Sequence, residues 1–343
     1  MGLYMDRPLK TPLVLLLAVL PLLGAGCGLV DTIQARGLAR EGNALYLKSD
    51  YRKAIEKYLQ ALELDPDTPN LQLNLGYSYF SIYNPNSESE QDRQAAREAV
   101  KYFSEHLKRH PKDENARIFE IKTLLTAAPS DPELADRALK TFLKMLQENP
   151  KDHEARQYLI TLFIDCKRYE DAVKFFEDDL RRKPDDIETM KILAIIADKS
   201  DRIQEAIDWY WRRAEVTEDR EKKAMLFYEI GTYTWNMLHY QPDRVTGPAA
   251  IKIADQGIEA CRHAMQLKEK YAEALVYANL LYLKRAVYES EEAGRTWDHA
   301  IAFELRVEAG KILGERKKKA EQAKLEEKQK DGTQEDSPDV KPQ

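Results

Sequence analysis

One helical pattern recurs five times along this chain with the same internal spacing. Each copy opens on an alanine and has an aromatic residue four positions later; in the first four copies a proline follows the aromatic residue after eight more positions. Residues three or four positions apart share one face of a helix, and a proline ends the helix. The copies begin at Ala54, Ala99, Ala138, Ala172 and Ala206. The spacing therefore predicts a fold built by stacking one repeated helical unit.

The pattern resembles the tetratricopeptide repeat, a helix–turn–helix unit of about 34 residues. Leu75, Gly76 and Tyr79 stand where this family has the Leu, Gly and Tyr of its first helix, and Pro150 and Pro184 lie one full repeat apart. The resemblance implies an all-α fold, an α-solenoid of about seven stacked helix–turn–helix repeats. The matches cover residues 35–309. Most aromatic side chains are then expected in the core between helix pairs.

Three repeats are longer than the family's unit, and the extra residues fall between the two helices of the repeat. They lie around residues 83–93, 127–134 and 238–249. The inserted sequences are polar or contain prolines, which is typical of loops. Because this turn lies on the same edge of every repeat in a solenoid, the insertions are expected to decorate one rim, where insertions often mark a binding face. The alternative is tolerated variation in loop length.

The amino terminus has the layout of an export signal. Arg7 and Lys10 precede an apolar run over residues 13–23, and three small residues follow at 24–26. A basic start, a short apolar stretch and small residues before a cleavage site are typical of a secretory signal peptide. Residues 1–26 are therefore predicted to be one.

Cys27 directly follows the small residues, an arrangement that resembles the lipobox of bacterial lipoproteins, although Gly24 replaces the usual Leu. The resemblance implies that Cys27 opens the mature chain and carries a lipid, with residues 27–34 as a short tether. Gly28 in place of an Asp then favours the periplasmic face of the outer membrane over the inner membrane. Two alternatives remain open: an uncleaved anchor helix over residues 13–30, and ordinary cleavage that leaves a soluble periplasmic chain.

Composition limits the partners that we expect, and the carboxyl-terminal sequence predicts how the chain ends. The chain of 343 residues is 33% charged with a formal net charge of −6, which gives no general attraction to nucleic acid. Cys166 and Cys261 lie in different repeats and are expected to be separate thiols. Residues 310–330 are rich in Lys and Glu, which predicts a charged capping helix. Residues 331–343 are polar with two prolines and are expected to be disordered.

Catalytic and metal-binding motifs were sought in the sequence without success, so no enzymatic activity, cofactor or metal is expected. His106 and His110 have the spacing that allows two ligands on one helical face, but no third ligand accompanies them, and a structural role is expected. His153 and Glu154 open no zinc-protease motif, because Gln157 stands where that motif has its second His.

A site known from the repeat family can be compared residue by residue. Some tetratricopeptide repeat proteins hold a peptide carboxylate with Lys, Asn and Arg side chains at fixed positions. Asn43 and Asn74 match the two Asn positions. The cations are replaced by Ala39, Asn115 and Phe119. Without them the charge-assisted hydrogen bonds to a carboxylate are lost.

We therefore expect a non-catalytic, membrane-tethered scaffold outside the cytoplasm that binds a protein or peptide, with no nucleic-acid partner and no small-molecule substrate. The partner-binding candidates lie on first helices and at the third insertion: Leu73, Tyr77, Phe80, Gln157, Thr161, Lys191, Ile195, Trp235, His239 and Tyr240. A role in cell-envelope assembly is expected. The alternatives are a pilotin-like lipoprotein for pilus or secretion-channel assembly, and an accessory protein that handles envelope polysaccharide or peptidoglycan.

Overall fold

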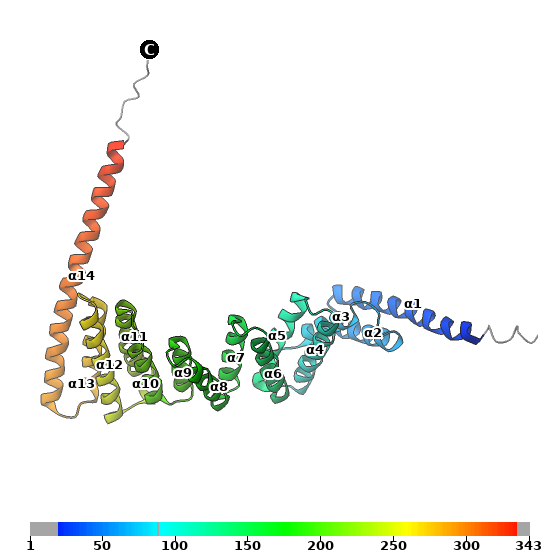
Figure 1. Cartoon of the computed structure of the whole chain (residues 1–343), viewed down its shortest axis with the longest axis horizontal. Coiled ribbons are helices and arrows are strands. Elements are labelled where there is room, and N and C mark those ends of the chain that lie inside the picture. Colours follow the sequence, from blue (N-terminus) through cyan, green and yellow to red (C-terminus); the bar gives the residue numbers. More distant parts are fainter. Residues whose placement is uncertain (1–19, 88, 335–343) are drawn as a thin grey trace, which may run out of the picture. The chain divides into compact units, whose positions relative to one another are not determined.

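The computed structural model describes residues 20–87 and 89–334 (Figure 1). Over these residues the regular elements are fourteen α-helices and two short 3-10 turns. The all-α class predicted from the sequence is confirmed. The chain divides into two compact units, Met1–Cys166 and Lys167–Gln343.

The first unit consists of helices that each pack on a neighbour in the sequence. They are α1 (Leu20–Leu47), α2 (Tyr51–Leu64), α3 (Leu71–Ile82), α4 (Glu90–Arg109), α5 (Glu114–Ala127), η1 (Ala128–Ser130), α6 (Pro132–Glu148) and α7 (His153–Asp165). The odd-numbered helices also contact one another, since α3 touches α1 and α5, and α5 touches α7. They form the layer that carries the first-helix candidates of this unit.

The second unit continues the same alternation. It contains α8 (Tyr169–Arg182), α9 (Ile187–Lys199), α10 (Ile203–Glu215), α11 (Arg220–Tyr240), η2 (Pro242–Arg244), α12 (Gly247–Leu267), α13 (Ala272–Tyr288) and α14 (Glu292–Gln334). Each of these α-helices packs on the next, and α11 also contacts α13. Among the described residues, fourteen helices follow one another along the chain, the number expected for seven helix–turn–helix repeats. Within the two units, six such pairs pack together: α1 with α2, α3 with α4, α5 with α6, α9 with α10, α11 with α12 and α13 with α14.

Small residues meet aromatic residues at the helix crossings, as the repeated spacing predicts. Tyr58 and Phe103 are almost fully buried. A β-carbon added to Gly42 would lie 2.6 Å from the Tyr58 ring, and one added to Gly76 would lie 2.7 Å from the Phe103 ring. Such distances are shorter than van der Waals contact, so glycine at these positions is what lets the first helix approach the aromatic residue of the second.

The three insertions differ in how closely they match the expected loops. Between α3 and α4, residues 83–87 and Ser89 form turns and irregular structure. The second insertion instead forms η1 with the adjoining ends of α5 and α6, and the third forms the end of α11, η2 and the start of α12. Leu238 and Val245 are buried in the core of the second unit. The prediction of simple loops was wrong for these two insertions, because both contain helical turns and the third buries two of its apolar side chains while most of its other residues are exposed.

The ends of the described chain also depart from the expected boundaries. Residues 1–19, with most of the predicted signal peptide, lie outside the described residues. The predicted tether, residues 27–34, is part of α1, and the Thr32 side chain hydrogen-bonds to Asp65 beyond the end of α2. Within the described chain we find no helix with the length and apolar character required to cross a bilayer.

Helix α14 passes through the predicted boundary at residue 310 without a break. It contains no proline, which is the residue that most strongly ends a helix. The same helix runs past residue 331, where disorder was expected, as far as Gln334; residues 335–343 lie outside the described part.

Candidate partner-binding surfaces

Three first-helix candidates of the first unit come together on α3. The ring centroids of Tyr77 and Phe80 lie 4.9 and 5.0 Å from that of Phe119 on α5, and Tyr77 also lies 5.2 Å from Phe103 on α4. Leu73 packs against the same group. We call these four rings the α3–α5 aromatic cluster. Its members pack edge to face on one another, so most of their apolar surface is already covered within the unit.

The two asparagines that match the carboxylate-binding pattern are hydrogen-bonded to each other. The Asn74 amide donates to Asn43 Oδ1 over 3.1 Å, and the Tyr58 hydroxyl donates to the same oxygen over 2.7 Å. At the positions of the missing cations, Ala39 is buried and Phe119 belongs to the aromatic cluster. The arrangement offers amide groups that can bond a peptide backbone, but not the charges that hold a carboxylate.

Four further candidates lie on other first helices. Gln157 and Thr161 are exposed on one face of α7 in the first unit. Lys191 is exposed and Ile195 is half-buried on α9 in the second unit. These four side chains therefore offer exposed polar groups and one half-buried apolar group, and none of them has an aromatic ring.

The three candidates near the third insertion form a compact aromatic group with a residue from α13. The Trp235 ring stacks on His239 with centroids 4.5 Å apart and planes 12° apart. Tyr240 and Tyr277 each meet Trp235 edge to face at 5.6 Å, and His239 lies 4.6 Å from Tyr240. Tyr240 is 69% exposed although its ring is held by two aromatic neighbours. The structure thus presents a preorganised ring to solvent.

The aromatic group continues along α11 and α13. Tyr228 lies 5.5 Å from Tyr277 and 5.3 Å from Tyr271, whose ring is covered by the Lys268 ammonium at 4.6 Å. Burial raises the pKa of Tyr271 to about 12. The sequence reasoning missed Tyr228 and Tyr277, although Tyr228 lies two helical turns before Trp235 and so shares its face. We call Tyr228, Trp235, His239, Tyr240 and Tyr277 the α11–α13 aromatic surface.

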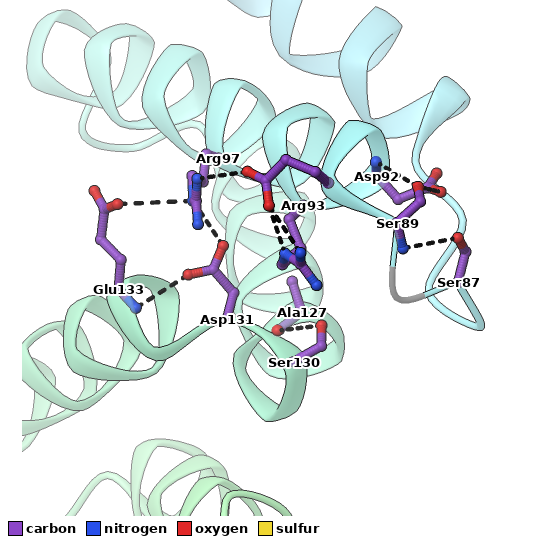
Figure 2. A network of polar contacts seen from close by, with 10 residues as sticks. Ser87, Ser89, Asp92, Arg93, Arg97, Ala127, Ser130, Asp131 and Glu133 are labelled. Carbon is purple, nitrogen blue, oxygen red and sulfur yellow. Dashed lines mark hydrogen bonds and ion pairs between the residues drawn. The ribbon is translucent and has the colours of Figure 1, made fainter.

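The second insertion is tied to α4 by an ion pair (Figure 2). Arg97 on α4 donates from Nε to the buried Asp131 carboxylate over 2.7 Å, and it also approaches Glu90 at 3.2 Å and Glu133 at 3.6 Å. Asp131 caps α6 by accepting from the backbone N–H groups of Glu133 and Leu134. The hydrogen bond to Asp131 raises the pKa of Arg97. This insertion therefore joins two neighbouring repeats.

The third insertion is tied to the turn between α9 and α10 in a similar way. Arg244 of η2 bonds the Asp198 carboxylate at 3.1 Å, the Asp198 carbonyl oxygen at 2.7 Å and Asp201 at 2.8 Å. The Tyr233 hydroxyl donates to Asp198 over 2.9 Å, and burial together with that carboxylate raises the pKa of Tyr233. Within this insertion, His239 and Tyr240 are exposed while Leu238 and Val245 are buried.

The surroundings of the His106–His110 pair and of the buried Cys261 thiol indicate structural roles. His106 is buried, with Nε2 2.9 Å from the Asp113 carboxylate. The backbone N–H of Ala116 and then His106 lower the pKa of Asp113. Burial raises the pKa of the Cys261 thiol to about 12. In the part of the chain that the structure describes, no three His, Cys, Asp or Glu side chains are grouped to hold a metal ion.

Comparison with known proteins identifies the repeats. Family models of the TPR repeat and the tetratricopeptide repeat match residues 42–82 and 133–208. A TPR repeat-containing protein of Methanocaldococcus jannaschii is 28% identical over 176 residues, which are 50% of this chain and 29% of that protein. The chain thus spans less than a third of this relative.

Among solved structures, a tetratricopeptide repeat protein from Parabacteroides merdae is 16% identical and covers 79% of this chain and 99% of its own, with a TM-score of 0.31. The chain contains tetratricopeptide repeats on an all-α solenoid fold. Repeats of this kind are typical of protein–protein interaction scaffolds.

Proposed function

We propose that this chain of tetratricopeptide repeats is a non-catalytic scaffold that holds a protein or peptide partner on its α11–α13 aromatic surface. The observation that carries the proposal is Tyr240, which is 69% exposed and yet fixed by contacts with Trp235 and His239. Aromatic side chains dominate the binding energy of protein interfaces, and a ring that is already ordered loses little entropy on binding. The surface therefore has the properties of a preformed anchor.

The partner chemistry that fits this surface is an apolar or aromatic segment of a protein. Trp235 has one face covered by His239, and its edges are met by Tyr240 and Tyr277. A sugar ring needs an open aromatic face for stacking, which makes the polysaccharide role the second candidate. The observation that supports the polysaccharide role is the exposed ring of Tyr240.

We also propose that the scaffold acts outside the cytoplasm, anchored to the periplasmic face of a bacterial outer membrane through a lipid on Cys27, in cell-envelope assembly. The support is the sequence alone: the apolar run at 13–23, the small residues at 24–26 and the cysteine after them. Intact-mass measurement of the membrane-extracted chain tests this, because a lipidated chain begins at Cys27 with added acyl mass. A Cys27→Ala chain that stays in the membrane at an unchanged mass would contradict it.

The binding proposal is tested by capture from detergent-solubilised native membranes, followed by quantitative mass spectrometry. His239→Ala/Tyr240→Ala is expected to lose the captured protein, since both side chains are exposed and their removal leaves the core intact. Val287→Ala is the matched control, because this residue on α13 is 71% exposed and lies outside the aromatic surface. Equal capture by all three chains would refute the proposal, and carbohydrate in place of protein in the eluate would favour the polysaccharide role.

A further inference from the structure

Helix α14 is apolar on the side that faces α13 and also on the opposite side. Leu305, Ala309 and Ile312 pack toward α13. On the outer side Phe303 is 57% exposed and Val307 is 39% exposed. Exposed apolar residues that line up on a surface are typical of a surface that contacts a partner. The outer side of α14 therefore has the character of a contact surface.

The outer residues follow the spacing of a coiled-coil seam. They recur at alternating intervals of four and three positions, the period that keeps one stripe facing a partner helix. The stripe, called here the outer seam, is Thr296, Ala300, Phe303, Val307, Gly310 and Gly314. All six residues are exposed. The two largest lie in the middle and the small ones lie at the ends.

Packing within this chain does not explain why the outer seam contains two glycines. A β-carbon at Gly310 or Gly314 would meet nothing within 4 Å. Glycine inside an exposed helix is destabilising relative to alanine. Small residues on a helix surface allow a second helix to approach closely. The glycines thus add an independent sign that a helix lies against this seam.

We propose that the outer seam binds the outer seam of a second copy of this chain, with the two α14 helices antiparallel. In the symmetric register, Phe303 packs against Val307 of the second copy and Ala300 packs against its Gly310. Each large residue then meets a branched one and each alanine meets a glycine. One patch serves both chains, as in an isologous dimer with two-fold symmetry.

Charges on α14 select the antiparallel direction. Lys317 and Lys318 are exposed and lie 12 and 13 positions beyond residue 305, the centre of the seam; the exposed Glu292 and Glu291, at and just before the start of α14, lie 13 and 14 positions before that centre. In the antiparallel register the lysines of one copy therefore lie beside the glutamates of the other. A parallel pair would place the lysines side by side, where like charges repel. Figure 1 shows α14 extending past the end of α13, so this segment is accessible to a second chain.

Disulfide trapping on the full chain in detergent tests the register. Ala300→Cys/Gly310→Cys is expected to give a covalent dimer of the 39.7 kDa chain on a non-reducing gel. The two positions are about 15 Å apart on one helix, which is too far for a bond within one chain. Gly310→Cys alone is expected to stay monomeric, because in this register it faces Ala300. A dimer from the single variant would show a parallel pair, and no dimer from the double variant would refute the contact.

Charge reversal tests the partner and its direction by sedimentation in density-matched detergent. Lys317→Glu/Lys318→Glu is expected to lose the dimer, and so is Glu291→Lys/Glu292→Lys; the chain that carries all four changes is expected to recover it. Gly310→Leu is expected to lose the dimer while the helix content stays unchanged. Val287→Glu, an exposed control outside the seam, is expected to leave the dimer in place. A wild-type chain that sediments as a monomer, or recovery that fails in the fourfold variant, would overturn the proposal.

Discussion

The α3–α5 aromatic cluster and the α11–α13 aromatic surface arise on equivalent first helices but differ in how much of their rings reaches solvent. In the first, Phe119 inserts between Tyr77 and Phe80 and also approaches Phe103, so the rings cover one another. In the second, Tyr240 stands at the edge and is 69% exposed. The comparison shows that an aromatic residue on a first helix is covered or exposed according to whether a neighbouring helix supplies a ring that packs over it.

The largest expected effect separates the two regions by stability. Phe103→Ala removes a fully buried ring from the α3–α5 cluster and is expected to lower the free energy of unfolding by about 3–5 kcal/mol. Tyr240→Ala is expected to change it by no more than about 0.5 kcal/mol, since exposed side chains contribute little. Urea denaturation measures both. Similar losses of unfolding free energy for the two variants would contradict the difference in burial between the two regions.

The next effect concerns the Arg97–Asp131 ion pair, which ties the second insertion to α4. Arg97→Ala leaves the fully buried Asp131 carboxylate without its guanidinium partner and is expected to lower the free energy of unfolding by more than the loss of an exposed ion pair does. Arg97→Ala/Asp131→Asn is expected to recover part of this loss, because the neutral amide still caps α6. Lys101→Ala, which breaks the more exposed pair with Glu98, is the control and is expected to cost less than about 1 kcal/mol. Equal costs for the two ion pairs would contradict a structural role for the insertion.

Sequence spacing predicted the helices well because it depends on local physics. The four-residue interval from Ala54 to Tyr58 places both side chains on one helical face, and the same packing of that face applies in every repeat. The pairing of Arg97 with Asp131 could not be predicted, because it joins residues 34 positions apart, one on α4 and one at the N-cap of α6, that only the tertiary fold brings together. Local composition predicts loops at the insertions, and it does not reveal that Leu238 is buried.

The candidate site was predictable only in part for the same reason. Trp235 and Tyr240 lie close in sequence and were recognised together. Tyr277 joins them from α13, and its contribution depends on the contact between α11 and α13. Tyr228 could have been found from its spacing to Trp235. The sequence does not indicate that the Phe119 ring packs against Tyr77 and Phe80, because Phe119 lies on another helix.

A smaller effect is expected on binding. Tyr240→Ala is expected to weaken the affinity for the captured partner by about 2 kcal/mol, or roughly thirtyfold in Kd, as for a typical interface anchor. Tyr77→Ala, in the α3–α5 cluster, is expected to leave Kd nearly unchanged in the fraction that remains folded. Isothermal titration calorimetry with the identified partner measures both values. A larger loss for Tyr77→Ala would move the binding site to the first unit.

The smallest effect concerns pH. Burial raises the pKa of Glu120, which accepts a hydrogen bond from Ser104. A carboxyl group with a raised folded pKa contributes stability that is fully present below its unfolded pKa and is lost as the pH rises through the folded pKa. The first unit is therefore expected to lose this contribution between acid and neutral pH. Glu120→Gln, which cannot ionise, is expected to flatten the dependence in urea denaturation across that range; an unchanged slope would contradict the assignment.

Hydrogen exchange on the purified complex tests the central claim most directly, because it compares the two aromatic regions in one experiment. If the α11–α13 aromatic surface holds the partner, amide exchange in the last turns of α11 and in α13 around Tyr277 slows when the partner is bound. Exchange in α3 around Tyr77 stays as it is in the free chain. Protection that appears at α3 and not at α11 and α13 would contradict the account.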